Sequence, residues 1–259
     1  MLAGDGAYGV RLRARSGALA GHTSGLGAGF IQANIVILPA PYADDFAAFC
    51  ASNAQACPLL GRSLPGDPAI PAIAGDLDMR HDLPAYRVFH DGRPTGIAHD
   101  VAALWRDDLV TFAIGCSFTF EAGLLRAGIP LRHVSQGRNV AMFRTNVPTR
   151  PAGPFAGPLV VSMRPVARAD VARAAAITAA FPEAHGAPVH AGDPAALGIA
   201  DIARPDYGDP VEVAPGEDPV FWACGVTSQV AAERAAIPFF IAHAPGAMLV
   251  TDLRHPAYA

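Results

Sequence analysis

The stretch DLVTFAIGCSFTFE, residues 108–121, decides the fold of this chain. Its apolar run at 109–114 predicts a buried strand, and residues 117–127 predict a helix that ends at Gly128. A second stretch, VFWACGVTSQ at 220–229, repeats this strand-to-helix arrangement. Strand-to-helix turns are where α/β proteins expose reactive groups and bind anions. The two stretches therefore predict an α/β fold with a functional site near these turns.

A cysteine stands at each of the two turns, Cys116 in the first and Cys224 in the second. The partial positive charge of a helix N-terminus stabilises a thiolate. The glycines Gly115 and Gly225 leave room for a ligand beside the backbone. Free cysteine is also commonly buried and inert. Both thiols are catalytic candidates, with buried packing as the alternative interpretation.

The remaining apolar pattern predicts further elements on both sides of the turns. We expect strands at 32–39, 159–164, 220–223, 237–242 and 247–252, and helices at 42–54, 170–180 and 227–235. Residues 1–30 are glycine-rich and are expected to form a loop that covers a site, and 58–80 should form a long irregular connection. Apart from the two cysteine turns, we find no internal repeat.

The composition limits the class of protein. Of 259 residues, 51% are hydrophobic, which is enough for a large core. The net charge of -4 is dispersed, so nucleic acid is not an expected partner. No apolar run approaches the ~20 residues of a membrane span. Met1–Asp5 lacks the features of a signal peptide, so we expect a soluble cytoplasmic protein, with a homodimer compatible with its apolar content.

The chain contains no lysine, and all 19 basic residues are arginine. Schiff-base chemistry through a lysine, including the usual pyridoxal phosphate linkage, is therefore excluded. A P-loop is excluded for the same reason.

Several polar residues are candidates for acid-base chemistry or metal binding. Glu121 could be a general acid or base, or a charge that complements the helix dipole. His133 and His243 are acid-base candidates, although a histidine at a strand end is commonly only hydrogen-bonded. His185 and His190 could hold a divalent metal, Mn²⁺ or Mg²⁺, but their spacing matches no standard zinc motif. Two loop histidines unrelated to metal are the alternative.

Two arginines in extended, apolar segments need a partner, because an unpaired buried charge is costly. Arg144 and Arg164 could each grip a substrate carboxylate, or pair with an internal Asp or Glu. Gln32 and Asn34 could orient a polar ligand or cap a sheet edge. We expect the substrate to be a small-molecule carboxylate, bound by these four residues with Asn146 and Thr227.

Taken in order, these segments resemble the hydro-lyases also called the D-glutamate cyclase family. The matching stretches are Gly29–Asn34 through Pro39, Phe49-Cys50 with Cys57–Leu60, Asp82–Pro84 with Tyr86–Val88, Trp105–Glu121, Gly137 with Asn139–Asn146, Val161–Pro165, His185–His190, Phe221–Gln229 and His243–Gly246. The resemblance spans nearly the whole chain. Ser228 and His22 depart from it, since the family usually has proline at the first position and often at the second.

The resemblance implies a three-layer α/β portion with a smaller two-layer α/β portion inserted. We expect residues 1–105 with 220–259 to form the outer domain and 106–219 the inserted one. It also implies loss of water from D-glutamate, which closes to 5-oxo-D-proline.

Three functions remain open from the sequence. In a lyase, Arg144 or Arg164 would bind the α-carboxylate, Glu121 or His243 would donate a proton, and Cys116 or Cys224 would be base or nucleophile. In a racemase or epimerase without a cofactor, the two thiols would face each other across a substrate carbon. In a non-catalytic binder of small carboxylates, the thiols would be inert.

Overall fold

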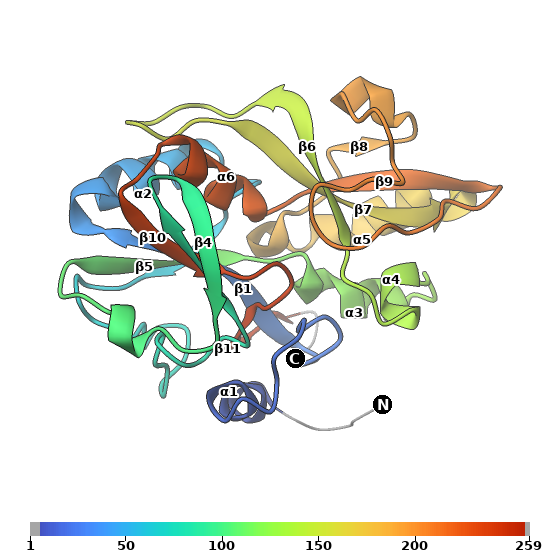
Figure 1. Cartoon of the computed structure of the whole chain (residues 1–259). Coiled ribbons are helices and arrows are strands. Elements are labelled where there is room, and N and C mark those ends of the chain that lie inside the picture. Colours follow the sequence, from blue (N-terminus) through green and yellow to red (C-terminus); the bar gives the residue numbers. More distant parts are fainter. Residues whose placement is uncertain (1–5, 257–259) are drawn as a thin grey trace.

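The computed structural model describes residues 6–256. The Met1–Asp5 segment discussed above and residues 257–259 lie outside the described part. The chain folds into two antiparallel sheets that lie side by side with helices packed on them (Figure 1). This arrangement confirms the predicted α/β class. Among the described residues, no helix has the length and apolar character needed to cross a membrane.

The predicted strands and helices are all present, with ends shifted by a few residues. The helices are α1 (Ala7–Arg15), α2 (Ala43–Ser52), α3 (Phe118–Arg126), α4 (Arg132–Ser135), α5 (Val171–Ala179) and α6 (Val226–Arg234), with 3-10 turns η1 (Ala40–Tyr42), η2 (Ala102–Leu104), η3 (Arg168–Asp170), η4 (Pro182–Ala184) and η5 (Pro194–Leu197). The strands are β1 (Phe30–Pro39), β2 (Leu59–Arg62), β3 (Tyr86–His90), β4 (Arg93–Ala98), β5 (Leu109–Gly115), β6 (Ala141–Pro148), β7 (Pro158–Ala167), β8 (His190–Ala191), β9 (Glu217–Ala223), β10 (Phe239–His243) and β11 (Leu249–Arg254).

The larger sheet has the order β2-β5-β1-β10-β3-β4, with β11 also paired to β1. Its central strand β1 is buried along almost its whole length, as the apolar run at residues 35–38 requires, and the polar Gln32 and Asn34 are buried with it. Helices α2 and α6 cover one face, where Phe46 and Ala231 join one hydrophobic cluster. The other face is covered by the irregular segment 64–85 through side chains such as Ile73 and Met79. The long connection predicted from the sequence therefore closes part of the core.

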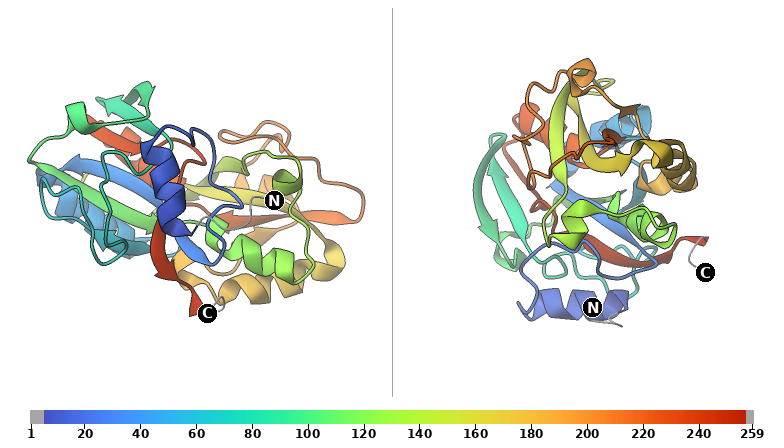
Figure 2. Two further views of the ribbon diagram at one scale, coloured as in Figure 1. Left: turned by 90° about the horizontal axis from the view of Figure 1, so that it is seen from below. Right: turned by 90° about the vertical axis from the view of Figure 1, so that its right-hand side faces the viewer.

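The smaller sheet has the order β6-β7-β9-β8. Helices α3 and α5 lie together on one of its faces (Figures 1 and 2). The boundaries between the segments that form the two sheets do not fall at the predicted domain boundaries, residues 106 and 219. Strand β5 pairs with β1 in the larger sheet, whereas β9 pairs with β7 in the smaller one. The division into an outer and an inserted domain stays a prediction.

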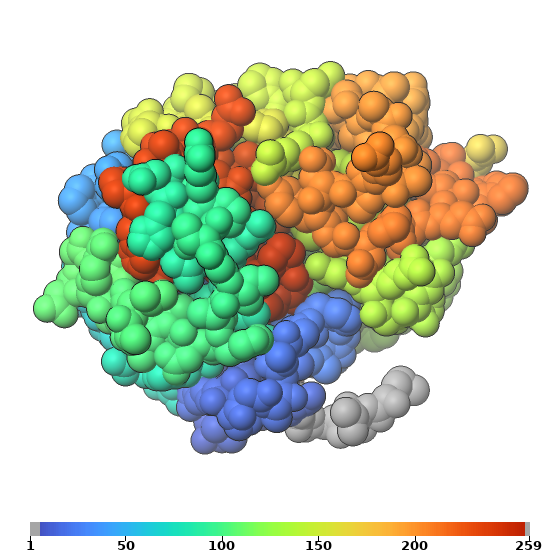
Figure 3. Space-filling view, in the orientation of Figure 1, coloured from blue at the N-terminus to red at the C-terminus, as the bar shows by residue number. Residues whose placement is uncertain are grey.

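The N-terminal segment is not only a loop, because residues 7–15 form α1. Ala7, Val10 and Ala14 are buried on one face of this helix, and Ala7 and Val10 belong to the same hydrophobic cluster as Val250. Arg11 is buried and pairs with Asp76 and, at 2.8 Å, with Asp252. A loop rich in glycine, residues 21–29, follows α1 and is called the glycine loop below. In the space-filling view this blue segment borders the yellow-green residues that follow α3 (Figure 3).

Candidate active site

Glu121 on α3 is the centre of a buried charged cluster. Its Oε1 accepts hydrogen bonds from Arg164 Nη2 at 2.7 Å and Nε at 3.2 Å, and it lies 2.8 Å from His133 Nε2. Its Oε2 accepts a hydrogen bond from Ser24 Oγ at 3.1 Å. One carboxylate therefore joins α3 to β7, to α4 and to the glycine loop.

The carboxyl group of Glu121 is ionised at neutral pH. Burial by itself would raise its pKa, but the neighbouring His133 and Arg164 outweigh burial and hold the pKa at about 2. Glu121 therefore does not fit the predicted role of proton donor. It fits the role of a fixed negative charge that attracts a cation or a hydrogen-bond donor.

Arg164 is fully buried and its guanidinium group is already paired inside the protein. Besides the carboxylate on α3, it donates to Ser117 Oγ at 3.0 Å and to Ser162 Oγ at 3.1 Å. Its guanidinium carbon lies 5.0 Å from the ring centre of Phe120 and 5.5 Å from that of Trp222. The internal partner weighed in the sequence analysis is therefore the one that Arg164 has, and this arginine does not fit the predicted grip on a substrate carboxylate.

A cavity of about 110 Å³ lies between the glycine loop and α3. Its lining consists of Gly25, Leu26, Gly27, Ala28, Gly29, Phe30, Gln32, Phe118, Thr119, Glu121, Ala122, Leu125 and Val134. Glu121 is the one charged side chain in this lining. The backbone N–H groups of Gly25, Gly27, Ala28 and Gly29 donate no hydrogen bond to another residue of the described part. We call this space the glycine-loop cavity.

Gln32 lines the glycine-loop cavity, but its amide group holds the loop. Its Nε2 donates to Thr23 O at 3.1 Å and to Leu26 O at 3.0 Å, and its Oε1 accepts from Thr23 Oγ1 at 2.7 Å. Its backbone N–H donates to Thr119 Oγ1 at 3.0 Å. Gln32 therefore shapes the cavity wall, and its side chain does not fit the predicted role of orienting a substrate.

The two cysteines contact one shared cluster of side chains at the boundary between the sheets. The cluster also contains Phe118, Val140, Met142, Val160, Val226, Val230 and Met248. Cys224 Sγ lies 3.6 Å from Met142 Sδ. Neither thiol lines the glycine-loop cavity.

Burial controls the acidity of both thiols. It raises the pKa of Cys116 well above its ordinary value and that of Cys224 to about 11, although the N–H groups of Phe118 and Val226 act in the opposite direction. The helix starts therefore do lower the pKa, as expected, but desolvation is larger. Both groups are neutral thiols at pH 7.

Two other predicted substrate ligands support the backbone near these turns. Asn34 Nδ2 donates to Gly115 O at 2.8 Å and to Ile114 O at 3.3 Å. Thr227 Oγ1 accepts the N–H of Val160 at 2.9 Å. Asn34 thus joins β1 to β5 and Thr227 joins α6 to β7, which does not fit a role in binding substrate.

The structure separates Arg144 and Asn146 from the charged cluster. Both are exposed on β6 and neither lines the glycine-loop cavity. Arg144 bonds to Tyr207 Oη and, at 3.2 Å, to Glu233. An internal carboxylate is again the partner, so Arg144 does not fit the predicted substrate contact.

His243 is also unsuited to the role predicted for it. Burial lowers its pKa to about 4, so the ring is neutral at pH 7. Its Nδ1 lies 3.2 Å from both the backbone N and the backbone O of Ile35. A neutral imidazole that is hydrogen-bonded to the backbone of β1 does not fit the predicted role of proton donor.

The two histidines of the predicted metal site bind backbone oxygens. His185 Nδ1 lies 2.9 Å from Gln55 O, and His190 Nε2 lies 2.8 Å from Asp193 O. Between residues 6 and 256, no group of three or more His, Cys, Asp or Glu side chains is placed to hold a metal ion. Binding of Mn²⁺ or Mg²⁺ stays an untested prediction.

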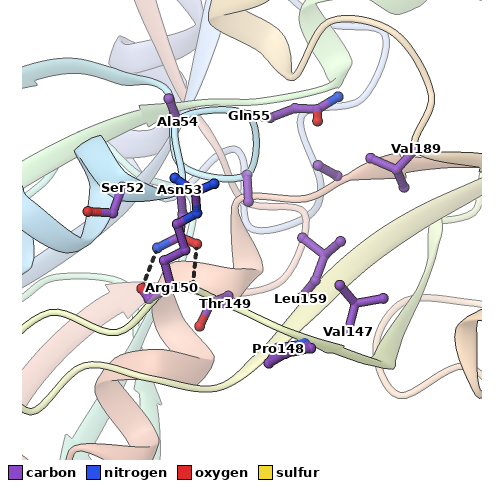
Figure 4. A pocket seen from close by; sticks show the side chains of 12 residues that line it. Ser52, Asn53, Ala54, Gln55, Val147, Pro148, Thr149, Arg150, Leu159 and Val189 are labelled. Carbon is purple, nitrogen blue, oxygen red and sulfur yellow. Dashed lines mark hydrogen bonds between the residues drawn. The ribbon is translucent and has the colours of Figure 1, made fainter.

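A second hollow, of about 370 Å³, is more open to solvent (Figure 4). It lies between residues 52–56 and 147–150, where the N–H of Arg150 donates to Asn53 Oδ1 at 2.9 Å and Asn53 Nδ2 donates to Arg150 O at 2.8 Å. Its lining contains none of the predicted site residues. The glycine-loop cavity, with a charged cluster in its wall, is therefore the better candidate active site.

Sequence reasoning missed Ser24 and Thr119, which complete this site. The pattern Cys-x-x-Thr, present at both turns, was a usable signal for Thr119. Ser24 carried no such signal, because it meets Glu121 only through the tertiary fold.

Comparison with known proteins gives a consistent result. A family model described as D-glutamate cyclase matches residues 110–252, a range that contains both cysteine turns. A Bordetella petrii protein named "Putative hydro-lyase" is 60% identical over 247 residues, 95% of this chain and 94% of its own. A relative of the same name in Verminephrobacter eiseniae is 57% identical, over 94% of this chain and 89% of its own.

A solved structure, a nitrogen repressor-like protein from Methanococcus jannaschii, covers 91% of both chains at 12% identity. Its TM-score of 0.38 is too low to indicate a shared fold. The family model and the full-length relatives agree with each other and with the resemblance noted in the sequence. The chain belongs to the D-glutamate cyclase family, whose relatives carry the name hydro-lyase.

Proposed function

We propose that this protein is a hydro-lyase that closes D-glutamate to 5-oxo-D-proline and water in the glycine-loop cavity. Family membership supports a hydro-lyase, and the observation that carries the choice of site is the ionised Glu121 in the wall of that cavity. The relatives are named for this class of reaction and not for a substrate. D-Glutamate as the substrate is therefore our proposal.

The reaction balances without a cofactor or a redox partner. The amine nitrogen of glutamate forms a bond to the side-chain carboxyl carbon, and one carbon–oxygen bond of that carboxyl group breaks. Two of the three ammonium protons leave with the oxygen as water, and the third stays on the ring nitrogen. The enzyme must therefore hold the ammonium and the carboxyl carbon close together and move two protons.

The cavity offers complementary groups for both ends of this substrate. The Glu121 carboxylate would accept hydrogen bonds from the ammonium group and fix the nitrogen beside the side-chain carboxyl. The unpaired N–H groups of the glycine loop would donate to the carboxyl oxygen on which negative charge grows as the ring closes. A water molecule needs roughly 10–15 Å³ of such space, so the cavity has room for about as many atoms as the roughly ten non-hydrogen atoms of glutamate.

A second route for the same reaction uses a thiol, although neither cysteine lines the glycine-loop cavity. Cys116, in the turn that precedes α3, would act as a base or as a nucleophile that forms a thioester with the side-chain carboxyl group. In the thioester route the sulfur forms a bond to the carboxyl carbon as water leaves, and the amine then displaces the thiol. This route needs a thiolate at a site where burial favours the neutral thiol.

The test is incubation of the protein with D-glutamate and with L-glutamate in D₂O, with and without Mn²⁺, followed by NMR. We expect 5-oxoproline from the D isomer. Loss of the α-proton signal without cyclisation would favour a racemase instead. If neither isomer changes under any condition, D-glutamate cyclisation is not the activity of this protein.

A further inference from the structure

The chain runs twice through the same series of elements. The first copy is β1, η1, α2, β2, β5, α3 and β6, and the second copy is β7, η3, α5, β8, β9, α6 and β10. Strands β1 and β7 each have 10 residues, β5 and β9 each have 7, and α3 and α6 each have 9. The strand orders β2-β5-β1-β10 and β8-β9-β7-β6 are the same when each strand is replaced by its counterpart. The internal repeat not found in the sequence is therefore present in the fold.

The register and hydrogen bonds at the two turns agree residue by residue. Ala33 of β1 pairs with Gly115, and Val161 of β7 pairs with Ala223. The N–H of Cys116 donates to Gln32 O at 2.9 Å, and the N–H of Cys224 donates to Val160 O at 3.0 Å. Beyond the helices, Arg126-Ala-Gly-Ile-Pro130 aligns with Arg234-Ala-Ala-Ile-Pro238. The third residue has positive φ in both, with values of 76° and 50°.

The two copies carry different charges at equivalent positions near the two turns. Glu121 in the first copy corresponds to Gln229 in the second, and Arg164 of β7 corresponds to Val36 of β1. Helix α4, which carries His133, has no counterpart between α6 and β10. The same turn and helix therefore form in the second copy without the carboxylate, the guanidinium or the imidazole.

The copies also differ in the space beneath the loop that precedes each first strand. In the second copy, a Cβ at Gly157 would lie 3.2 Å from Arg234 Cδ and 3.6 Å from Val230 Cγ1, so this loop packs on α6. In the first copy, a Cβ at Gly27 would lie 2.6 Å from Val250 Cγ1 of β11, and the glycine-loop cavity lies between the loop and α3. A hollow of about 320 Å³ also borders the second copy's loop at Ala156, Gly157 and Pro158, but Gln229 does not line it. Of the two equivalent helix residues, Glu121 therefore faces the space beside its loop and Gln229 does not.

The second copy serves as an internal control for the first. Burying an ion pair is commonly no more stabilising than well-packed apolar residues in its place. Because the architecture forms with Gln229 and Val36, the fold does not require the Glu121–Arg164 pair. We propose that only the first copy is catalytic, with Glu121 the catalytic carboxylate and Arg164 and His133 its positioning residues. The Cys224–Gln229 turn is then the structural counterpart.

The structural part of this inference is tested without any substrate. Arg164→Met removes the guanidinium from the buried Glu121 carboxylate, which keeps only His133 and Ser24 as partners, and should destabilise the protein strongly. Glu121→Gln/Arg164→Met instead places an amide and an apolar side chain at these positions, the residue types that Gln229 and Val36 supply at the equivalent positions of the second copy. We expect the double variant to recover most of the urea resistance that Arg164→Met loses. A double variant as unstable as Arg164→Met would show that the pair is structural and would overturn the inference.

The catalytic part rests on the proposed function and uses turnover of D-glutamate. Glu121→Gln should lower kcat/KM about 100-fold or more, and the matched variant of the second copy, Gln229→Leu, should leave it unchanged. His133→Gln keeps a donor for Glu121 but removes the imidazole that helps to lower the Glu121 pKa, so the acidic limb of the kcat/KM profile should move to higher pH. An equal loss in Gln229→Leu, or an unmoved limb in His133→Gln, would contradict our assignment. A wild-type protein without turnover would defeat the proposed function and leave the stability result standing.

Discussion

Thr119 and Thr227 occupy the same position in the two strand-to-helix turns and make the same bond. Thr119 Oγ1 accepts the N–H of Gln32 at 3.0 Å, and Thr227 Oγ1 accepts the N–H of Val160 at 2.9 Å. Each threonine hydroxyl therefore provides the acceptor for one backbone N–H group of a strand. The bond ties the start of a helix to the neighbouring strand in both copies.

Replacing either threonine by valine should destabilise the protein by a similar amount. The change leaves one buried N–H group without an acceptor, which costs about 1–3 kcal/mol. Urea unfolding of Thr119→Val and Thr227→Val measures this cost, and Thr119→Ser and Thr227→Ser should restore most of it. A cost confined to one of the two sites would contradict their structural equivalence.

Glu121 should make stability fall in acid. Its pKa in the folded protein, about 2, lies below the ordinary 4.5, so its contribution is complete above about pH 5 and disappears as the pH falls through the folded value. The difference corresponds to about 3 kcal/mol. Urea unfolding from pH 6 to pH 2 should show this loss in the wild type. The slope should be smaller in Glu121→Gln, and equal slopes would mean that Glu121 is not held ionised.

His243 should contribute to pH dependence in a different window. Its folded pKa of about 4 lies below the ordinary 6.5, so the unfolded chain binds a proton first and stability falls between about pH 7 and pH 4. His243→Asn places an amide that can hydrogen-bond the backbone of Ile35 but cannot titrate. The variant should therefore lose less stability than the wild type between pH 7 and pH 4.5. Unchanged pH dependence would rule out His243 as a source of the slope.

The cysteines should react slowly with thiol reagents at neutral pH. Cys116 and Cys224 are buried, and burial raises the pKa of both, so little thiolate is present. Labelling by a disulfide reagent should accelerate up to pH 10 without a plateau. Rapid labelling at pH 7 that D-glutamate blocks would instead favour a catalytic thiol. Variants with one cysteine each, tested at the same pH values, would show which thiol reacts.

Gly225 should resist replacement because Asn34 lies against it. A Cβ at position 225 would lie 2.1 Å from Asn34 Nδ2, the atom that donates to Gly115 O. Gly225→Ala should cost about 1–3 kcal/mol through overpacking. In Asn34→Ala the obstruction is removed, so the double variant should be more stable than the sum of the two single effects allows. Additive effects would show that the two side chains do not meet.

Local patterns allowed much of the fold to be predicted, and tertiary contacts decided the rest. Apolar runs identified β1, β5 and β9 because buried strands need them, and the cysteine turns were found from glycine beside a strand end. The partners of Arg144 and Arg164 could not be predicted, since both arginines lie in similar apolar segments. One is exposed on an edge strand, and the other is buried against Glu121 because α3 packs on β7.

The acidity of the thiols was unpredictable for the same reason. The helix-start effect on Cys116 and Cys224 is local and could be anticipated. Desolvation depends on Met142, Met248 and other residues brought together from different elements. Desolvation has the larger effect on the pKa of both thiols, so the pKa is raised, whereas the position at a helix start had predicted a lowered pKa.

The exchange of final strands makes the two halves of the chain dependent on each other. Strand β6 ends the first copy but pairs with β7, and β10 ends the second copy but pairs with β1. Two subunits that traded their last strands across a two-fold axis would have this connectivity, so the chain has the topology of a strand-swapped dimer joined into one polypeptide. The joining segment turns an association that would depend on concentration into one within a single molecule. Neither half can complete its sheet until the other has been made, and both should unfold in one transition.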